Sequence, residues 1–243
     1  MKAWLRFFRV VNLPTVPGDV LAGAAVVIAS EGATSGEAES FPLRVAATCV
    51  ASVFLYMFGL ADNDIVGVKT DKGRPIADGQ ISLGAARWAR GLCVFAALII
   101  GSLANLPATW WVAAFLLVVA IAVYNRTKLC LVMGLCRGLN VLCGGAVFCA
   151  SLTSGKDSAA PLLWTSACVA VWTIYITFVT WYSAGEETDP EKKRRIGFLI
   201  GAIVYLQLIV LLIFRVDPLL LTGAALLVVL RLMKRFLPEV SAS

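Results

Sequence analysis

Long apolar runs alternate with short polar segments along almost the whole chain. Each run is about 20 residues long and carries few charges, which is the length that crosses the hydrocarbon core of a bilayer as a helix. Strands of a membrane barrel would instead show about ten residues of alternating polarity. The pattern therefore predicts an all-α, polytopic transmembrane bundle of about eight spans in a single domain, residues 1–243. The first span is expected to end near residue 30, and the others to cover about 42–61, 85–103, 108–124, 129–152, 161–184, 196–214 and 219–232.

The composition agrees with a membrane protein. The chain is 60% hydrophobic and 15% charged, whereas a soluble domain is nearer 25% charged. Its seven cysteines lie in or beside apolar runs without a CxxC pair, and are predicted to be packing residues rather than disulfide partners or zinc ligands. The chain has no histidine, which excludes histidine metal sites and nucleophiles activated by histidine.

The net charge of +6 is explained better by membrane orientation than by nucleic-acid binding. If the N-terminus is cytoplasmic, most Lys and Arg residues fall in cytoplasmic segments, and the external loops hold only Arg44, Lys156 and Arg215. This asymmetry follows the positive-inside rule and predicts a multi-pass protein of the cell (inner) membrane with both termini in the cytoplasm. No nucleic-acid partner is expected. The two most polar stretches, residues 62–82 and 185–195, then lie on the same cytoplasmic side.

The first polar stretch concentrates carboxylates and cations directly after an apolar run. Asn63 and Asp64 are followed by Asp71 and Arg74. If this segment is helical, Asp64 and Asp71 share a face. Two carboxylates on one face could hold Mg²⁺ ions that bridge a diphosphate, and Arg74 could neutralise the phosphate oxygens. The alternative is a solvated loop of balanced charge.

Two further motifs lie on the same side of the membrane. Glu186 and Asp189 are three residues apart, so their carboxylates could converge. Tyr124 and Lys128 are four residues apart and could both face the mouth of the bundle. The alternatives are an ordinary acidic loop neutralised by the following basic residues, and an interfacial tyrosine beside a lysine placed by the positive-inside rule.

Polar residues also occur inside the apolar runs. Arg137 and Asn140 lie in the middle of the fifth run, and Asn12 and Asp19 belong to the first. An ionisable group within the membrane needs an internal partner, so these residues are predicted to line a site. A purely structural pair of Asp19 with Arg137 is the alternative. The glycines around Arg137 either allow close helix packing or leave room for a chain-like ligand.

Taken together, these segments resemble the UbiA superfamily of intramembrane prenyltransferases over nearly the whole chain. The similarity to the EboC-like branch is carried by GDVLAG at residues 18–23 and MGLCRGLN at residues 133–140. The motifs that carry the superfamily resemblance are Asn63-Asp64-x-x-Gly67-x-x-x-Asp71, then Arg74-Pro75-Ile76-x-x-Gly79-x-Ile81-Ser82, Tyr124-x-x-x-Lys128, and the acidic residues Glu186 and Asp189.

The resemblance implies a helical bundle with a central cavity open to lipid. It also implies Mg²⁺-dependent transfer of a prenyl group from a prenyl diphosphate to an acceptor that the sequence does not identify. The metal ligands would be Asp64, Asp71, Glu186 and Asp189, and Arg74 and Lys128 would contact the diphosphate directly. Other residues expected to bind substrate are Asn63, Tyr124, Arg137, Asn140, Asn12 and Asp19.

The first motif departs from the family pattern at Gly67, which stands where the family has its middle aspartate. A water, or a neighbour such as Asp62, could fill the vacant metal position. The loop that follows is also shorter than in the family. The alternative to an enzyme is therefore a non-catalytic UbiA-like protein that binds or transports lipids.

Overall fold

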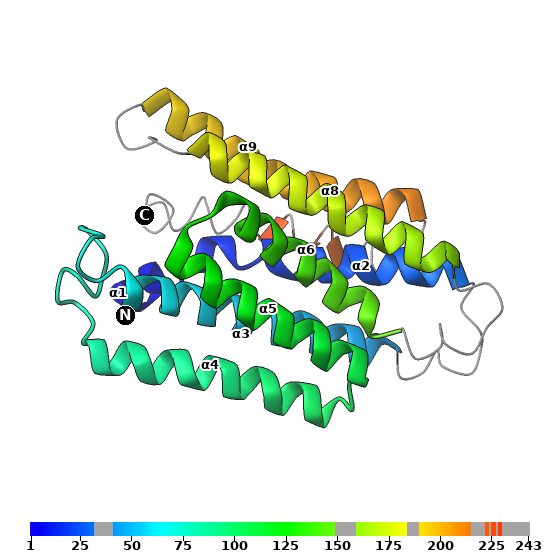
Figure 1. Cartoon of the computed structure of the whole chain (residues 1–243), viewed down its shortest axis with the longest axis horizontal. Coiled ribbons are helices and arrows are strands. Elements are labelled where there is room, and N and C mark those ends of the chain that lie inside the picture. Colours follow the sequence, from blue (N-terminus) through cyan, green and yellow to red (C-terminus); the bar gives the residue numbers. More distant parts are fainter. Residues whose placement is uncertain are drawn as a thin grey trace.

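The computed structural model describes residues 1–31, 41–148, 159–183 and 190–214, together with the pairs 222–223, 225–226 and 228–229. These residues form helices and turns and contain no strand, so the predicted all-α bundle is confirmed (Figure 1). In chain order the elements are α1 (Lys2–Phe7), the 3-10 helix η1 (Val10–Asn12), α2 (Thr15–Glu31), α3 (Phe41–Val66), α4 (Leu83–Leu103), α5 (Ala108–Thr127), α6 (Cys130–Ala146), α8 (Ala159–Ser183) and α9 (Pro190–Phe214).

Six segments of the described chain are long and apolar enough to cross a membrane, and they correspond to α2, α3, α4, α5, α8 and α9. Helix α6 occupies the fifth predicted span but has only 17 residues, about 25 Å of helix. It ends at Ala146 rather than near residue 152. Of the eighth predicted span, 219–232, only the pairs 222–223, 225–226 and 228–229 are described, so the total of about eight spans stays a prediction.

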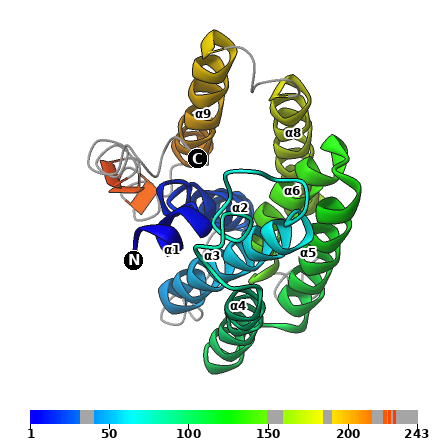
Figure 2. The same ribbon diagram turned by 90° about the vertical axis from the view of Figure 1, so that its left-hand side faces the viewer.

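Helix α2 lies at the centre of the bundle, and α4 lies at its edge (Figure 2). Of the α2 span 78% is buried, against 17% of the α4 span. Glycines let α6 pack directly on α2: a Cβ added at Gly23 would collide with the carbonyl oxygen of Val141, and one at Gly144 with that of Val20. Gly134 and Gly138 likewise let α6 pack closely on α8, because a Cβ added at either position would collide with atoms of α8. These glycines therefore serve close helix packing.

Helix α3 continues past its apolar run to Val66, so the first acidic residues lie on its last turns. Residues two positions apart point about 200° apart around a helix, which sends Asp62 and Asp64 to opposite sides. The chain then turns back, and the amide of Asp71 donates to the carbonyl of Gly67 at 2.8 Å. The predicted helical face shared by Asp64 and Asp71 is therefore wrong, because the helix ends between them.

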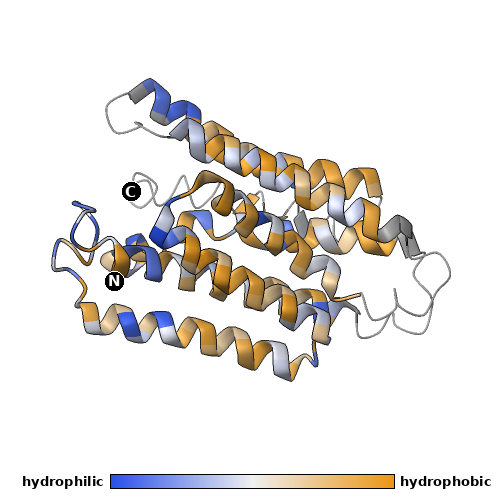
Figure 3. Ribbon diagram, viewed as in Figure 1, coloured by the Kyte–Doolittle hydropathy of each residue, from blue (hydrophilic) through white to orange (hydrophobic). Residues whose placement is uncertain are grey.

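The polar loop between α3 and α4 folds over one end of the bundle. Gly73 and Gly79 take φ values of +78° and +70°, a region that suits glycine, and the Ser82 hydroxyl caps α4 by accepting from the amide of Ala85 at 3.2 Å. The N-terminus and the α5–α6 turn lie at the same end, as do the end of α8 and the start of α9 (Figure 1). Hydrophilic residues gather there, whereas the sides of the bundle are mostly apolar (Figure 3).

Candidate functional site

A cavity of about 320 Å³ lies beneath this polar end, between α2, α3, α5 and α6. Its middle is mostly apolar, and its polar lining falls into two groups. On α3 the groups are marked by Asn63 and Ser52, which are separated by about 16 Å of helix. The group near Asn63, here called the mouth, also contains Arg9, Asp71, Arg74, Tyr124, Asn125 and Lys128. Arg137 and Asn140 line the cavity about 10 and 15 Å of helix beyond the start of α6, which follows Lys128, so they are grouped with Ser52 and this group is here called the floor.

Lys128 enters the mouth because of the way α5 ends. It takes a left-handed conformation with φ of 55°, and its amide donates to the carbonyl of Tyr124 at 2.7 Å. The Lys128 ammonium donates a hydrogen bond to Oδ1 of Asn63 and lies 5.5 Å from the centre of the Tyr124 ring. Both members of the predicted Tyr124–Lys128 pair therefore line the cavity together with Asn63.

Two arginines complete the positive side of the mouth. Arg74 Nη1 and Arg9 Nη2 lie 3.5 and 4.0 Å from Oδ1 of Asp64. Arg9 belongs to a basic N-terminal segment that also contains Lys2 and Arg6. Nothing in its local sequence separates it from Lys2 and Arg6, so its position is decided by the fold.

The positive charges at the mouth repel one another, and besides burial this repulsion helps to lower the pKa values of Arg74 and Lys128. Partial burial, and then the charge of Arg9, lower the pKa of Arg74. Burial also lowers the pKa of Lys128; Asp71 opposes this shift, and Arg74 and Arg9 add to it. A bound anion would relieve this repulsion, so the mouth has the electrostatics of an anion-binding site.

The carboxylates near the end of α3 differ in how well they are paired. Asp62 accepts from Arg90 and from Asn125, both at 2.9 Å, and it does not line the cavity. Asp62 therefore ties α3 to α4 and α5, and it lies away from the cavity that Asp71 lines. Asp64 does not line the cavity either, but the described donors around it all lie at 3.5 Å or more.

Asp71 lines the mouth and bonds through Oδ1 to the Thr70 hydroxyl at 2.9 Å. Gly67 lies directly below it, since a Cβ added there would be 2.5 Å from Asp71 Oδ2. The predicted ligands Glu186 and Asp189 lie outside the described residues. Within the described ranges no group of three or more Asp, Glu, Cys or His residues is placed to hold a metal. Asp71, and the loosely paired Asp64 behind it, carry carboxylate oxygens of the kind that Mg²⁺ prefers, and their role as metal ligands stays a prediction.

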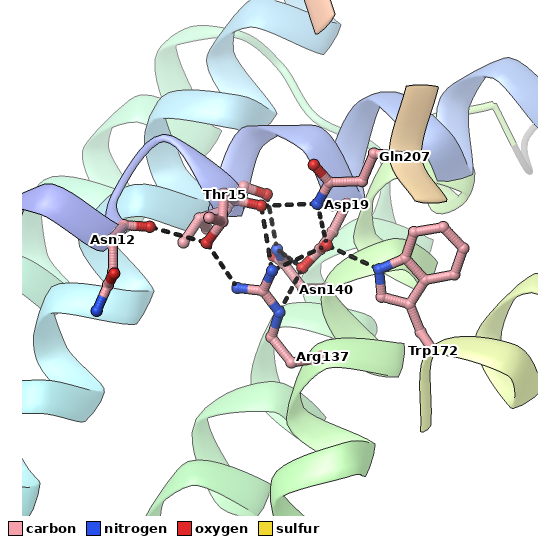
Figure 4. A network of polar contacts seen from close by, with 8 residues as sticks. Asn12, Thr15, Asp19, Arg137, Asn140, Trp172 and Gln207 are labelled. Carbon is pink, nitrogen blue, oxygen red and sulfur yellow. Dashed lines mark hydrogen bonds and ion pairs between the residues drawn. The ribbon is translucent and has the colours of Figure 1, made fainter. Parts of the chain in front are cut away.

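Below the floor, Asp19 is the centre of a buried polar network (Figure 4). It forms an ion pair with Arg137, at 2.9 Å from Nε and 3.1 Å from Nη2. It also accepts from Asn140 at 3.1 Å, Trp172 at 2.8 Å and Gln207 at 2.7 Å. Asp19 therefore joins α2 to α6, α8 and α9. It is fully buried and does not line the cavity, whereas Arg137 and Asn140 do.

Asn12 does not line the cavity either. Its carbonyl accepts from the Thr15 hydroxyl at 2.8 Å, and its side chain points away from Asp19 (Figure 4). Sequence reasoning also missed Ser52, Tyr56 and Asn125, which line the cavity. Only Asn125 carries a signal, as a polar residue next to Tyr124 at the end of an apolar run.

A comparison with solved structures finds a similar architecture in a known protein. The chain is similar to a structure described in work on digeranylgeranylglyceryl phosphate synthase in membranes, with a TM-score of 0.54 and 14% sequence identity. The match covers 100% of this chain and 91% of the other. The two chains therefore share one fold, which agrees with the UbiA-like helical bundle predicted from the sequence. No protein-family model and no curated protein matches the sequence, so the likeness concerns the fold.

Proposed function

We propose that this protein is a membrane prenyltransferase. It binds a prenyl diphosphate with the phosphates at the mouth and the hydrocarbon against the apolar wall, and transfers the prenyl group to an acceptor. One observation carries this proposal: Arg9, Arg74 and Lys128, from three separate segments, converge with Asp71 at one end of an apolar cavity in a membrane bundle. The fold likeness supports the same function, and GDVLAG and MGLCRGLN favour the EboC-like branch.

Mg²⁺ is the proposed cofactor, held by Asp64 and Asp71 together with Glu186 and Asp189. When bound, it would neutralise the diphosphate and so improve it as a leaving group. Asp64 suits this role better than its neighbour Asp62, because its surrounding donors are distant whereas Asp62 is paired at 2.9 Å. We also propose that the polar end of the bundle faces the cytoplasm, as the lysine and arginine distribution predicts.

The proposed reaction breaks the allylic carbon–oxygen bond, and the electron pair leaves with the diphosphate. Arg74 and Lys128 would stabilise that developing charge. The apolar wall would limit the access of water to the allylic cation. A nucleophilic atom of the acceptor then bonds to the allylic carbon and releases its proton to the solvent.

The test uses the full chain in lipid nanodiscs with radiolabelled farnesyl diphosphate as the probe. Mg²⁺-dependent release of pyrophosphate in the presence of extracted membrane lipids is the expected result. Arg74→Gln should weaken farnesyl diphosphate binding by about tenfold to a hundredfold, since a hydrogen bond to a charged group contributes ~1.5–3 kcal/mol. Asp71→Asn should reduce the Mg²⁺-dependent part of the release.

Arg87→Gln is the matched control, because Arg87 is an exposed arginine at the same end of the bundle that does not line the cavity. It should bind farnesyl diphosphate as the wild type does. Tight binding without pyrophosphate release under any condition would favour the non-catalytic lipid carrier. Equal binding by wild type and Arg74→Gln would refute the assignment of the mouth to the diphosphate.

A further inference from the structure

Among the residues that line the floor, Oγ of Ser52 and Oδ1 of Asn140 are buried and have neither a hydrogen bond nor an ion pair with a described residue, whereas the buried Nε of Arg137 is paired with Asp19. Both side chains line the cavity, and the two residues are only 2% and 4% exposed. The orientation of the Asn140 amide follows from its neighbours. Its Nδ2 donates to the Val16 carbonyl and to Asp19, both at 3.1 Å, and neither of these groups is a donor. The free atom is therefore the carbonyl oxygen.

Ser52 differs from three threonines of α8, although Thr165 of the same helix has a buried, unpaired hydroxyl that does not line the cavity. Thr173, Thr177 and Thr180 each donate to the carbonyl four residues earlier, at 2.8, 2.6 and 2.8 Å, which is the usual way to satisfy a hydroxyl in an apolar helix. A buried polar atom left unpaired costs about 1–3 kcal/mol. A hydrocarbon tail that reached the floor would leave both atoms unpaired, whereas a polar ligand group would satisfy them.

The floor offers hydrogen bonds without net charge. Arg137 is neutralised by its ion pair with Asp19. Its Nε and Nη2 face Asp19 and the Thr15 carbonyl, while Nη1 has only a 3.5 Å contact with the Thr15 hydroxyl. Because a guanidinium carries two protons on Nη1, donor capacity remains on the residue that lines the floor. A free carbonyl oxygen, a free hydroxyl and this donor suit a group that both donates and accepts.

We propose that the floor binds a hydroxyl group of an uncharged alcohol or phenol, and that this molecule is the prenyl acceptor. Only its role as acceptor rests on the proposed function; the binding of a hydroxyl does not. The hydroxyl donates to Asn140 Oδ1 and accepts from Ser52 Oγ, and Arg137 Nη1 is a second donor on the same floor. Since about 16 Å of helix separates the floor from the mouth, this hydroxyl anchors the acceptor, and a different atom attacks the prenyl carbon.

The proposal is tested by fluorine NMR of the full chain in detergent micelles, with three probes of similar size. 4-Fluorophenol carries a neutral hydroxyl, 4-fluorotoluene has no polar group, and 4-fluorobenzoate is an anion. We expect saturable binding that is tightest for 4-fluorophenol. Ser52→Ala should weaken the binding of 4-fluorophenol about twofold to twelvefold, as expected for a hydrogen bond that contributes ~0.5–1.5 kcal/mol, and leave the binding of 4-fluorotoluene unchanged.

Thr48→Val is the matched control. Thr48 lies one helical turn from Ser52 on α3 and also has a buried, unpaired hydroxyl, but it does not line the cavity. Both variants remove an unpaired hydroxyl, so each should unfold at a temperature no lower than the wild type. Only Ser52→Ala should lose affinity for 4-fluorophenol.

Equal affinity for 4-fluorophenol and 4-fluorotoluene, no saturable phenol binding, tighter binding of 4-fluorobenzoate, or equal phenol affinity in Ser52→Ala and Thr48→Val would each overturn the proposal. Failure of the proposed function has a different signature. If 4-fluorophenol binds at the floor but no pyrophosphate is released from farnesyl diphosphate in the presence of Mg²⁺, the proposed hydroxyl site is retained and the proposed transferase function is rejected.

Discussion

Replacing Asp19 by leucine should destabilise the bundle more than replacing Asp19 and Arg137 together. Asp19→Leu leaves the guanidinium of Arg137 buried without its carboxylate, and breaking a buried pair in this way costs about 3–5 kcal/mol. The donors on Asn140, Trp172 and Gln207 also lose their acceptor, at up to ~1 kcal/mol each. A domain whose whole stability is 5–15 kcal/mol would lose a large part of it.

The double variant Asp19→Leu with Arg137→Met removes both charges and keeps similar volumes. Only the neutral donors then lose a partner, so the loss should fall to about 1–3 kcal/mol. The assay is equilibrium unfolding in dodecylmaltoside micelles titrated with sodium dodecyl sulfate. Arg195→Gln is the control, since it breaks the exposed pair with Glu191, which contributes at most ~0.5 kcal/mol. If the single variant were no less stable than the double variant, the buried positive charge of Arg137 would not need Asp19 to compensate it, and the reasoning would be refuted.

Two further predictions concern the mouth. A bound diphosphate raises the pKa of Lys128 above its value in the free protein. The contribution of Lys128 to diphosphate binding is therefore fully present below the free-protein pKa and is lost as pH rises through the bound-state pKa. Because the free value is lowered from 10.5, farnesyl diphosphate affinity should begin to fall at lower pH than for an ordinary lysine, and Lys128→Arg should remove that decline. Gly67→Asp places a second carboxylate beside Asp71 and should lower the Mg²⁺ concentration for half-maximal pyrophosphate release by about fivefold, as ~1 kcal/mol of added attraction implies. Gly67→Ala adds only the Cβ that crowds Asp71 and should raise it; a lower Mg²⁺ requirement in both variants would rule out a charge effect.

The architecture follows from properties that can be counted along the chain. Burial in lipid depends on the length and polarity of a segment, so the apolar runs were sufficient to predict helical spans and their approximate ends. Because spans alternate in direction, their number between two polar stretches also predicts that these stretches lie on one side. The two ends that flank residues 184–189 lie at the same end of the bundle as the first motif for this reason (Figure 1).

The roles of individual polar residues depend on rotation about helix axes and on partners distant in sequence. Asp62 and Asp64 are nearly identical in sequence context, yet the end of α3 directs one to Arg90 and the other to Arg74. Asp19 meets Arg137 across 118 positions and Gln207 across 188. No local pattern encodes such pairings, because they depend on close helix packing that glycines on α2 and α6 permit only once both helices are in place.

The sequence alone therefore determined the membrane bundle, the common side of its polar segments and the types of residue available for chemistry. The tertiary structure decided that Asp19 and Asp62 support the fold, that Arg9 joins the mouth, and that Ser52 reaches the floor without a partner. The physical reason is that apolar length is a property of each segment by itself. The cost of a buried charge or hydroxyl depends instead on every atom that surrounds it.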